Sequence, residues 1–153
     1  MKRAFTLLLA AVLLLSLPVT ASAANSTGGK ADITTRIEPT YTVTIPADVT
    51  VRFNDVKTCF GAIEVVDAQI HPDKCIKVCL ASDGKLENGI DASKVLPYAI
   101  KDRRGNTFTS AVYLTEGDKT ELFIHITPDD WKAAYAGEYS DTVTFTVSYE
   151  NKR

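Results

Sequence analysis

The chain has 153 residues, with 17 Lys and Arg against 19 Asp and Glu, so its formal net charge is −2. This mildly acidic balance argues against a nucleic-acid partner, which would favour a basic surface. No basic run indicates binding to an anionic membrane surface. The length suits a single domain.

The first 23 residues have the composition of a secretory signal peptide. Met1-Lys2-Arg3 is basic, residues 4–17 are mostly apolar, and Ala21-Ser22-Ala23 is a small-residue cleavage site. The apolar run is short for a membrane span. We therefore expect cleavage after Ala23, secretion, and no membrane attachment after cleavage. An uncleaved N-terminal anchor is the alternative.

The chain from residue 24 onward divides into three parts. Residues 24–32 are small and polar, which predicts a flexible leader. Residues 33–150 carry the hydrophobic alternation of a folded domain, and residues 151–153 form a polar tail.

A period of two begins near the start of this domain. Tyr41, Val43 and Ile45 alternate with threonines, which predicts a half-buried strand that ends at Pro46. The same alternation over residues 49–53 predicts a second short strand.

Residues 60–70 form a longer apolar stretch. The apolar positions change parity at Val65–Val66, which indicates a β-bulge there. Residues 71–74, His-Pro-Asp-Lys, are a turn signal, and a strand follows over residues 75–80. We expect the two strands to form a hairpin.

The middle of the domain has weaker signals. Residues 82–94 are predicted to be a loop because they contain Asp83-Gly84 and Asn88-Gly89. Three further strands are predicted over residues 98–101, 111–114 (an edge strand) and 122–126. Thr127 as the N-cap and Pro128 at the first helical position predict one or two helical turns.

The last strand, residues 139–149, has the clearest alternation. Its face predicted to be buried includes Val143, Phe145 and Val147, and its face predicted to be exposed includes Thr142, Thr144 and Thr146. About seven or eight such strands and almost no helix predict an all-β fold, an antiparallel Ig-like β-sandwich.

Gly137-Glu138-Tyr139 introduces this last strand. A Gly before a Tyr that enters a strand suits a tyrosine corner, in which the phenol bonds back to the backbone. The alternative is that Tyr139 is simply the first core residue of the strand.

Two segments carry a family resemblance. Thr40-Tyr41-Thr42-Val43-Thr44-Ile45-Pro46-Ala47-Asp48-Val49-Thr50-Val51 resembles the opening of Ig-like modules in secreted and cell-surface proteins of Gram-positive bacteria. Residues 136–149 resemble the end of the same modules, and related endings occur in spore-coat-U-like and WxL-type surface proteins. The resemblance implies an Ig-like sandwich at the cell surface and no catalytic residues. Trp131 stands in Trp-Lys-Ala, so the Trp-x-Leu signature of wall-binding domains is absent.

Three cysteines, Cys59, Cys75 and Cys79, make an odd count for a secreted chain. A disulfide from Cys59 to Cys75 or to Cys79 is one interpretation, and reduced thiols that pack as small apolar groups are the other. Four strand residues span roughly 13 Å, too far for Cys75 and Cys79 to share one metal ion. We therefore expect no metal and no cofactor.

No catalytic signature is recognisable. His71 lies in a turn, His125 lies on the outer face of a strand, and neither belongs to a known nucleophile–base pattern. A hydrolase that uses Cys79 with His125 is a remote alternative. The chain is therefore predicted not to be an enzyme.

Exposed aromatic side chains are the best candidates for binding. Phe123 has outward parity in its strand, and Trp131 and Tyr135 precede the last strand. Such side chains stack on sugars or anchor a protein partner. For Trp131 the alternative is packing against the end of the core.

These patterns predict a non-enzymatic structural or adhesion module, secreted or held at the cell surface, with a surface protein or a cell-wall polysaccharide as its partner. A carbohydrate-binding module that uses Phe123, Trp131 and Tyr135 is the first alternative. The second is a pilin-like assembly subunit that needs a donated strand, for which residues 33–37, Ile-Thr-Thr-Arg-Ile, would serve as the donor.

Overall fold

The computed structural model describes residues 31–152. The predicted signal peptide and most of the predicted leader lie outside these residues. The chain divides into two units, Met1–Thr35 and Arg36–Arg153. In the first unit, residues 31–35 are described, and they have no regular secondary structure.

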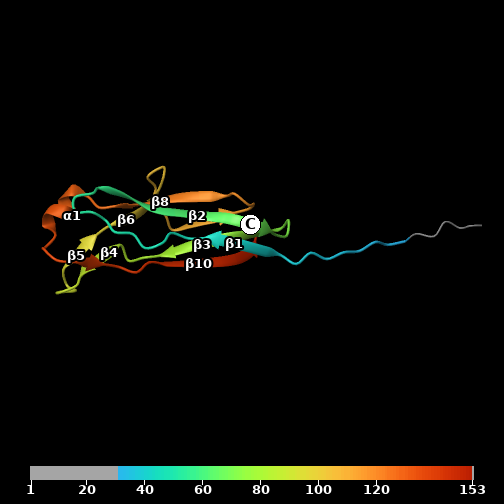
Figure 1. Ribbon diagram of the computed structural model, residues 1–153, viewed down its shortest axis with the longest axis horizontal. Coiled ribbons are helices and arrows are strands. Elements are labelled where there is room, and N and C mark those ends of the chain that lie inside the picture. Colours follow the sequence, from blue (N-terminus) through green and yellow to red (C-terminus); the bar gives the residue numbers. More distant parts are fainter. Residues whose placement is uncertain (1–30, 153) are drawn as a thin grey trace, which may run out of the picture. The chain divides into compact units, whose positions relative to one another are not determined.

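The second unit contains a four-stranded antiparallel sheet (Figure 1). Its order is β1 (Thr40–Thr44), β2 (Lys57–Gln69), β8 (Lys119–His125) and β6 (Ala99–Asp102). The prediction of a strand over residues 49–53 is wrong, because these residues form no strand. Pro46 removes a backbone donor, and Asn54 takes a positive φ of 65° in a turn, so this segment crosses the molecule as irregular chain.

A second antiparallel sheet has the order β10 (Thr144–Asn151), β3 (Lys74–Ala81) and β7 (Ser110–Tyr113). The predicted hairpin of β2 with β3 is wrong, because β2 pairs with β1 and β8 while β3 pairs with β10 and β7. The turn between β2 and β3 instead carries the chain from one sheet to the other. Alternation shows that a segment is a strand but does not select its neighbour.

A third small sheet has the order β5 (Val95–Pro97), β4 (Lys85–Asn88) and β9 (Tyr139–Ser140). Strand β4 lies inside the segment predicted to be a loop, and residues 141–143 divide the predicted last strand into β9 and β10. The helix α1 (Pro128–Ala133) begins as predicted, with Thr127 as its N-cap accepting a hydrogen bond from the Asp130 amide at 3.1 Å. In the described part of the chain, no helix has the length and hydrophobicity needed to span a membrane.

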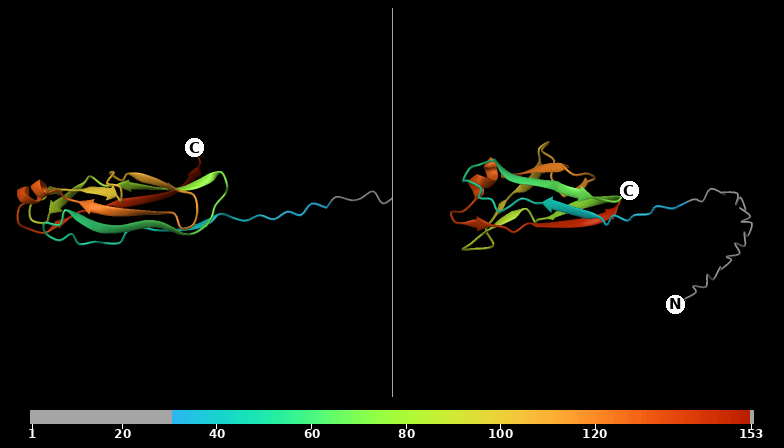
Figure 2. Two further views of the ribbon diagram at one scale, coloured as in Figure 1. Left: turned by 90° about the horizontal axis from the view of Figure 1, so that it is seen from above. Right: turned by 45° about the vertical axis from the view of Figure 1, so that its right-hand side comes forward.

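The two larger sheets share one hydrophobic core. Ile63 and Leu122 of the four-stranded sheet are fully buried, as are Ile76 and Val78 of the three-stranded sheet. Figure 2 shows the strands of both sheets running along the long direction of the unit, with α1 at the end away from the C-terminal residue. The prediction of an all-β, antiparallel fold is therefore confirmed.

Strand β2 contains two bulges. Thr42 pairs with Asp67 and Val43 with Val65, so Val66 is the extra residue, as the parity change predicts. A second bulge lies at Phe60, next to Gly61, whose φ is 130°. A Cβ on Gly61 would lie 3.2 Å from the Cβ of Pro46, so this backbone packs directly against the crossing segment.

Candidate functional site

Strand β10 has an inward face that is only partly covered. Thr142, Thr144 and Thr146 are exposed, as predicted from their parity. Val143 and Phe145 are half-buried, while Val147 remains 37% exposed although it shares their face. The prediction that Val147 is buried is therefore wrong, and Val147 lies on an edge strand of its sheet.

The facing wall of the molecule is also apolar and uncovered. Ile45 is 47% exposed and Val49 is similarly open, although both line a hollow between the sheets. The hollow has a volume of about 410 Å³, and its lining includes Ile45, Val49, Phe60, Val143 and Phe145. The two sheets therefore do not close over each other on this side.

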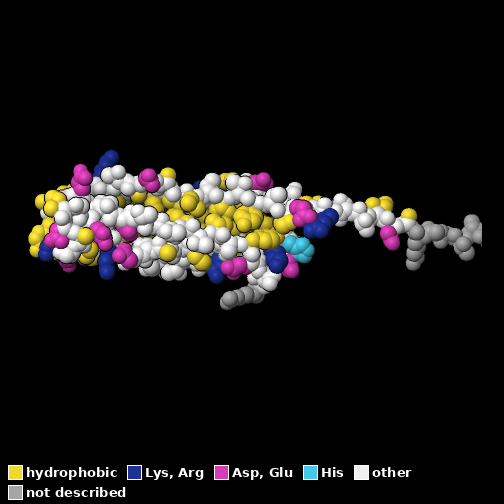
Figure 3. Space-filling view, turned by 90° about the horizontal axis from the view of Figure 1, so that it is seen from below, with side chains coloured by type: hydrophobic (Ala, Val, Ile, Leu, Met, Phe, Trp, Pro, Cys, Tyr) yellow, Lys and Arg dark blue, Asp and Glu magenta, His cyan; other side chains and the backbone are white. Residues whose placement is uncertain are grey.

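Figure 3, seen from the side on which β10 lies in Figure 1, shows the consequence as a continuous band of hydrophobic side chains. We call this feature the edge groove and define it by the hollow just described together with Val147, Tyr41 and Tyr149. Sequence reasoning missed the groove. The sequence contains the apolar residues of both walls of the groove. Alternation predicts that these residues point inward, but it does not show whether another element covers them.

Two tyrosines cross the far end of the edge groove. The rings of Tyr41 in β1 and Tyr149 in β10 stack, with 5.7 Å between their centroids. Tyr149 also lines a second hollow, of about 680 Å³, with Ile37, Pro39, Ile70 and others. The apolar line thus continues from Phe145 through Val147 to Tyr149 along one face of β10.

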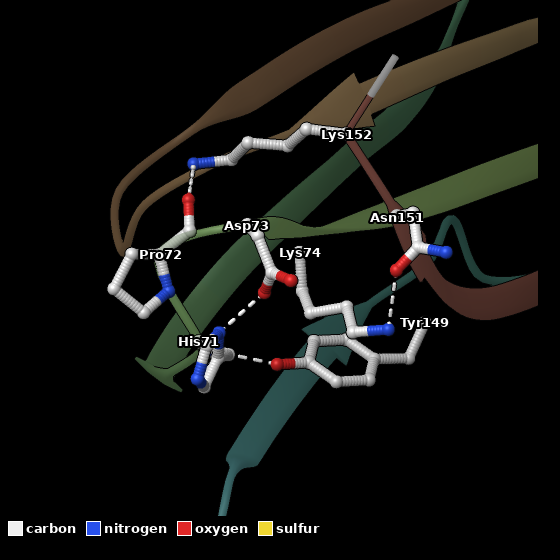
Figure 4. Close-up of polar contacts among 7 residues, drawn as sticks. All are labelled: His71, Pro72, Asp73, Lys74, Tyr149, Asn151 and Lys152. Atoms are coloured by element: carbon white, nitrogen blue, oxygen red, sulfur yellow. Dashed lines mark hydrogen bonds and ion pairs between the residues drawn. The ribbon is translucent and has the colours of Figure 1, made fainter.

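Polar contacts fix this end of β10 to the turn before β3 (Figure 4). The His71 amide donates to the Tyr149 hydroxyl at 2.8 Å, and Lys74 Nζ donates to Asn151 Oδ1 at 2.5 Å. Lys152 Nζ donates to the Pro72 carbonyl at 2.9 Å. The His71 ring bonds to Asp73 and lowers the pKa of that carboxyl group. The bond from the His71 amide fixes the Tyr149 hydroxyl, and the other bonds fix the end of β10 to the turn.

The other end of the edge groove carries a half-buried phenol, that of Tyr98. The Tyr98 hydroxyl donates to the Asp141 carboxylate and lies 2.8 Å from Ser82 Oγ. Partial burial, reinforced by the Asp141 carboxylate, raises the pKa of Tyr98 to about 12. Tyr98 and Asp141 both line the hollow, and with Asp48 and Thr142 they add polar groups to a wall that is otherwise apolar.

Tyr139 forms the predicted corner. Its hydroxyl donates to the Tyr135 carbonyl and accepts from the Tyr135 amide, both at 3.0 Å, while its ring packs against the core. Gly137 has a φ of 147°, and a Cβ there would lie 2.4 Å from Nδ2 of buried Asn88. The corner is therefore built around a glycine that no other residue would replace without displacing Asn88.

The three aromatic candidates do not converge on one site. Phe123 lies on the outer face of β8 with Lys57 Nζ 4.1 Å from its ring centre. Trp131 donates from Nε1 to the Asp55 carbonyl at 3.0 Å and packs edge-on against Phe53. Tyr135 is exposed beside Lys94. None of the three lines the edge groove.

The three cysteines are free thiols in the described structure. Cys59 pairs with Phe123 on the outer face of the four-stranded sheet. Cys75 and Cys79 lie in β3 of the other sheet, opposite in parity to buried Ile76 and Val78. Cys59 and Cys79 therefore lie on outer faces of different sheets.

Residues suited to metal or acid–base chemistry are scattered. Within residues 31–152, no three His, Cys, Asp or Glu side chains lie close enough together to hold a metal ion. Partial burial, and then the charges of Lys101 and Lys57, lower the pKa of His125. His125 lies on β8 and Cys79 on β3, so the structure does not bring this pair together on one strand or one sheet.

Comparison with known proteins adds no relative. The sequence matches no protein-family model, and no curated protein matches it either.

Proposed function

We propose that this chain is an exported, non-enzymatic structural subunit that assembles with other proteins through its edge groove. The observation that carries the proposal is the exposure of inward-facing apolar side chains, above all Val147 and Ile45, along the side where the sheets stay open. Exposed apolar surface of this kind marks sites that a partner covers. A long groove beside a free strand edge suits an extended segment better than a compact ligand.

The strand order supports an Ig-like interpretation with one strand missing. The order β1-β2-β8-β6 corresponds to the A-B-E-D sheet of Ig domains, and β3 and β10 take the places of strands C and F. The corner formed by Tyr139 agrees, because tyrosine corners belong to strand F. Strand G would lie beside β10, where residues 31–152 provide no strand. Strand β7, which pairs with β3, departs from the usual order.

Export rests on the first 23 residues, whose basic start, apolar run and Ala21-Ser22-Ala23 site favour secretion. The carbohydrate-binding alternative has less support, since Trp131 contacts Asp55 and Phe53 whereas Phe123 contacts Lys57.

The test compares two Val→Asp variants in cells that produce the protein. Val147→Asp places a charge in the edge groove. Val112→Asp places one on β7 of the same sheet, where Val112 is 56% exposed and outside the groove. We expect the wild-type chain and Val112→Asp to appear in high-mass surface material and Val147→Asp to remain a free monomer. Circular dichroism and urea unfolding of the monomer verify that it is folded.

Assembly of Val147→Asp at the wild-type level would contradict the proposal, as would a wild-type protein found only as free monomer. If Val147→Asp unfolds, Val147→Thr replaces it, because threonine keeps the shape and strand preference of valine while reducing its hydrophobicity. Reduced assembly of a folded Val147→Thr protein supports the groove as the docking site.

A further inference from the structure

We propose that the segment that fills the edge groove is the leader of a second copy of this chain, with residues 31–38 adding as a strand along β10. The inference rests on the proposed function, because it names the occupant of the same groove. The acceptor is the unpaired edge of β10, and the donor places Ile33 and Ile37 among the apolar side chains of the groove.

Strand β10 is the better acceptor edge. It has eight residues in unbroken register with β3, and Thr144, Thr146 and Ser148 on its outer face are uncharged. Edge strands that avoid pairing are usually short, bulged, charged or interrupted by proline. The facing edge strand, β1, has five residues, meets a bulge and is followed by Pro46. Of these two edges, only β10 offers a long, regular ladder.

The leader has the pattern of a strand but forms no strand in the described structure. Ala31, Ile33, Thr35 and Ile37 alternate with polar residues, yet residues 31–39 are in no strand. Ile33 is 98% exposed and Ile37 is 73% exposed. On the polar side, Arg36 Nε lies 2.7 Å from Glu38 Oε1, which is the contact that an extended backbone allows between residues i and i+2. Ile37 lines the hollow beside Tyr149, yet both isoleucines remain largely exposed, so most of this apolar face is uncovered.

The dimensions of donor and acceptor agree. Ile33 and Ile37 are four residues apart, or about 13 Å in an extended strand. Phe145 and Tyr149 have the same separation along β10, with the uncovered Val147 between them. When the isoleucines face inward, Asp32, Thr34 and Arg36 face outward beside the polar outer face of β10. The added strand then has its apolar face toward the groove and its polar face toward solvent.

We assign the donor to a second copy because the backbone directly before β1 contains no turn that would lead residues 31–38 back to β10 of the same chain. Pro39 directly precedes β1, a proline favours extended backbone at Glu38, and residues 36–39 contain no turn. Each copy would therefore donate at one end and accept at its groove. Such a contact joins different surfaces and extends as an open chain of subunits.

The test is complementation between two variants of the full chain, purified as the producing cell processes it. The donor variant is Ile33→Asp/Ile37→Asp, and the acceptor variant is Val147→Asp. The controls are Ile90→Asp, at an isoleucine that is 90% exposed outside both regions, and Val112→Asp. Light scattering coupled to gel filtration measures mass over a range of protein concentrations.

We expect the wild-type chain and both controls to form oligomers whose mass rises with concentration. Each variant alone should remain monomeric, whereas an equal mixture should give a 1:1 dimer that grows no further, since only one donor and one groove remain functional. Oligomers formed by Ile33→Asp/Ile37→Asp alone, or a mixture that stays monomeric, would overturn the inference.

A purified wild-type chain that stays monomeric also overturns it. If the surface assembly in cells still depends on Val147, another protein then donates the strand and the proposed function stands. If the donor variant is monomeric but less stable than a monomeric wild-type chain, the leader fills the groove of its own chain, which contradicts donation between copies.

Discussion

The rings of Tyr41 and Tyr149 stack with 5.7 Å between centroids and 23° between planes, and they connect the free edge strands of the two sheets. The Tyr149 hydroxyl accepts a hydrogen bond from the His71 amide, so the ring that closes this end of the edge groove is held from a third element. The sheets are therefore joined at one end of the groove and remain open along Val147 and Ile45.

This arrangement separates two effects at Tyr149. Tyr149→Ala removes the half-buried ring and the stacking contact, and we expect it to lower the free energy of unfolding by about 2–3 kcal/mol. Tyr149→Phe keeps the ring and removes only the acceptor for the His71 amide, for an expected loss of about 1 kcal/mol. Urea unfolding measures both. Equal losses for the two variants would show that the stack contributes nothing.

The two faces of β10 predict unequal effects at neighbouring positions. Phe145 packs against Phe60 with 6.0 Å between ring centroids but is only half-buried. We expect Phe145→Ala to cost about 2–3 kcal/mol, below the 3–5 kcal/mol typical of a fully buried phenylalanine. Thr144→Ala, on the exposed face, should change stability by less than about 0.5 kcal/mol. Chemical denaturation of both variants tests this, and similar small changes would mean that Phe145 does not pack as described.

The corner at Tyr139 predicts a cost without any loss of packing. Tyr139→Phe keeps the ring against the core but leaves the Tyr135 amide and carbonyl without their shared partner. We expect a loss of about 1–2 kcal/mol in the free energy of unfolding. Tyr135→Phe is the control, because its own hydroxyl takes no part in the corner, and it should leave stability within about 0.5 kcal/mol of wild type. A Tyr139→Phe protein as stable as this control would show that the corner is not a stabilising contact.

Much of the strand content follows from the sequence because the physics is local. Alternation over residues 41–45 and 122–126 predicts strands that the structure contains, and Thr127-Pro128 predicts the start of α1. The bulge at Val66 also follows, because a parity change within one strand requires an extra residue.

The pairing and the groove do not follow from the sequence. His71-Pro72-Asp73-Lys74 has the composition of a hairpin turn, yet it joins strands of different sheets, because the partner of β3 is β10, far away in the chain. Val147 has the parity of a buried residue, but its exposure depends on whether another strand lies beside β10. These features depend on contacts between distant segments, which no local pattern encodes.

The phenol of Tyr98 gives a prediction about alkaline pH. Partial burial and the Asp141 carboxylate raise its pKa from 10.0 to about 12 in the folded protein. A folded pKa above the unfolded value means that folding favours the protonated phenol, so this contribution to stability is complete below pH 10. It is lost as the pH rises toward 12.

Ultraviolet absorbance of tyrosinate measures this titration among the six tyrosines. Burial also raises the pKa of Tyr113, so two tyrosines should ionise late. We expect the Tyr98 part of this late component near pH 12, accompanied by falling stability between pH 10 and 12, and we expect Tyr98→Phe to reduce the late component by one tyrosine. Asp141→Asn keeps an oxygen acceptor for the phenol and removes the negative charge, so it should shift the late component to lower pH. A wild-type titration in which all tyrosines ionise near pH 10 while the protein remains folded would contradict the partial burial of Tyr98 beside Asp141 at the end of the edge groove.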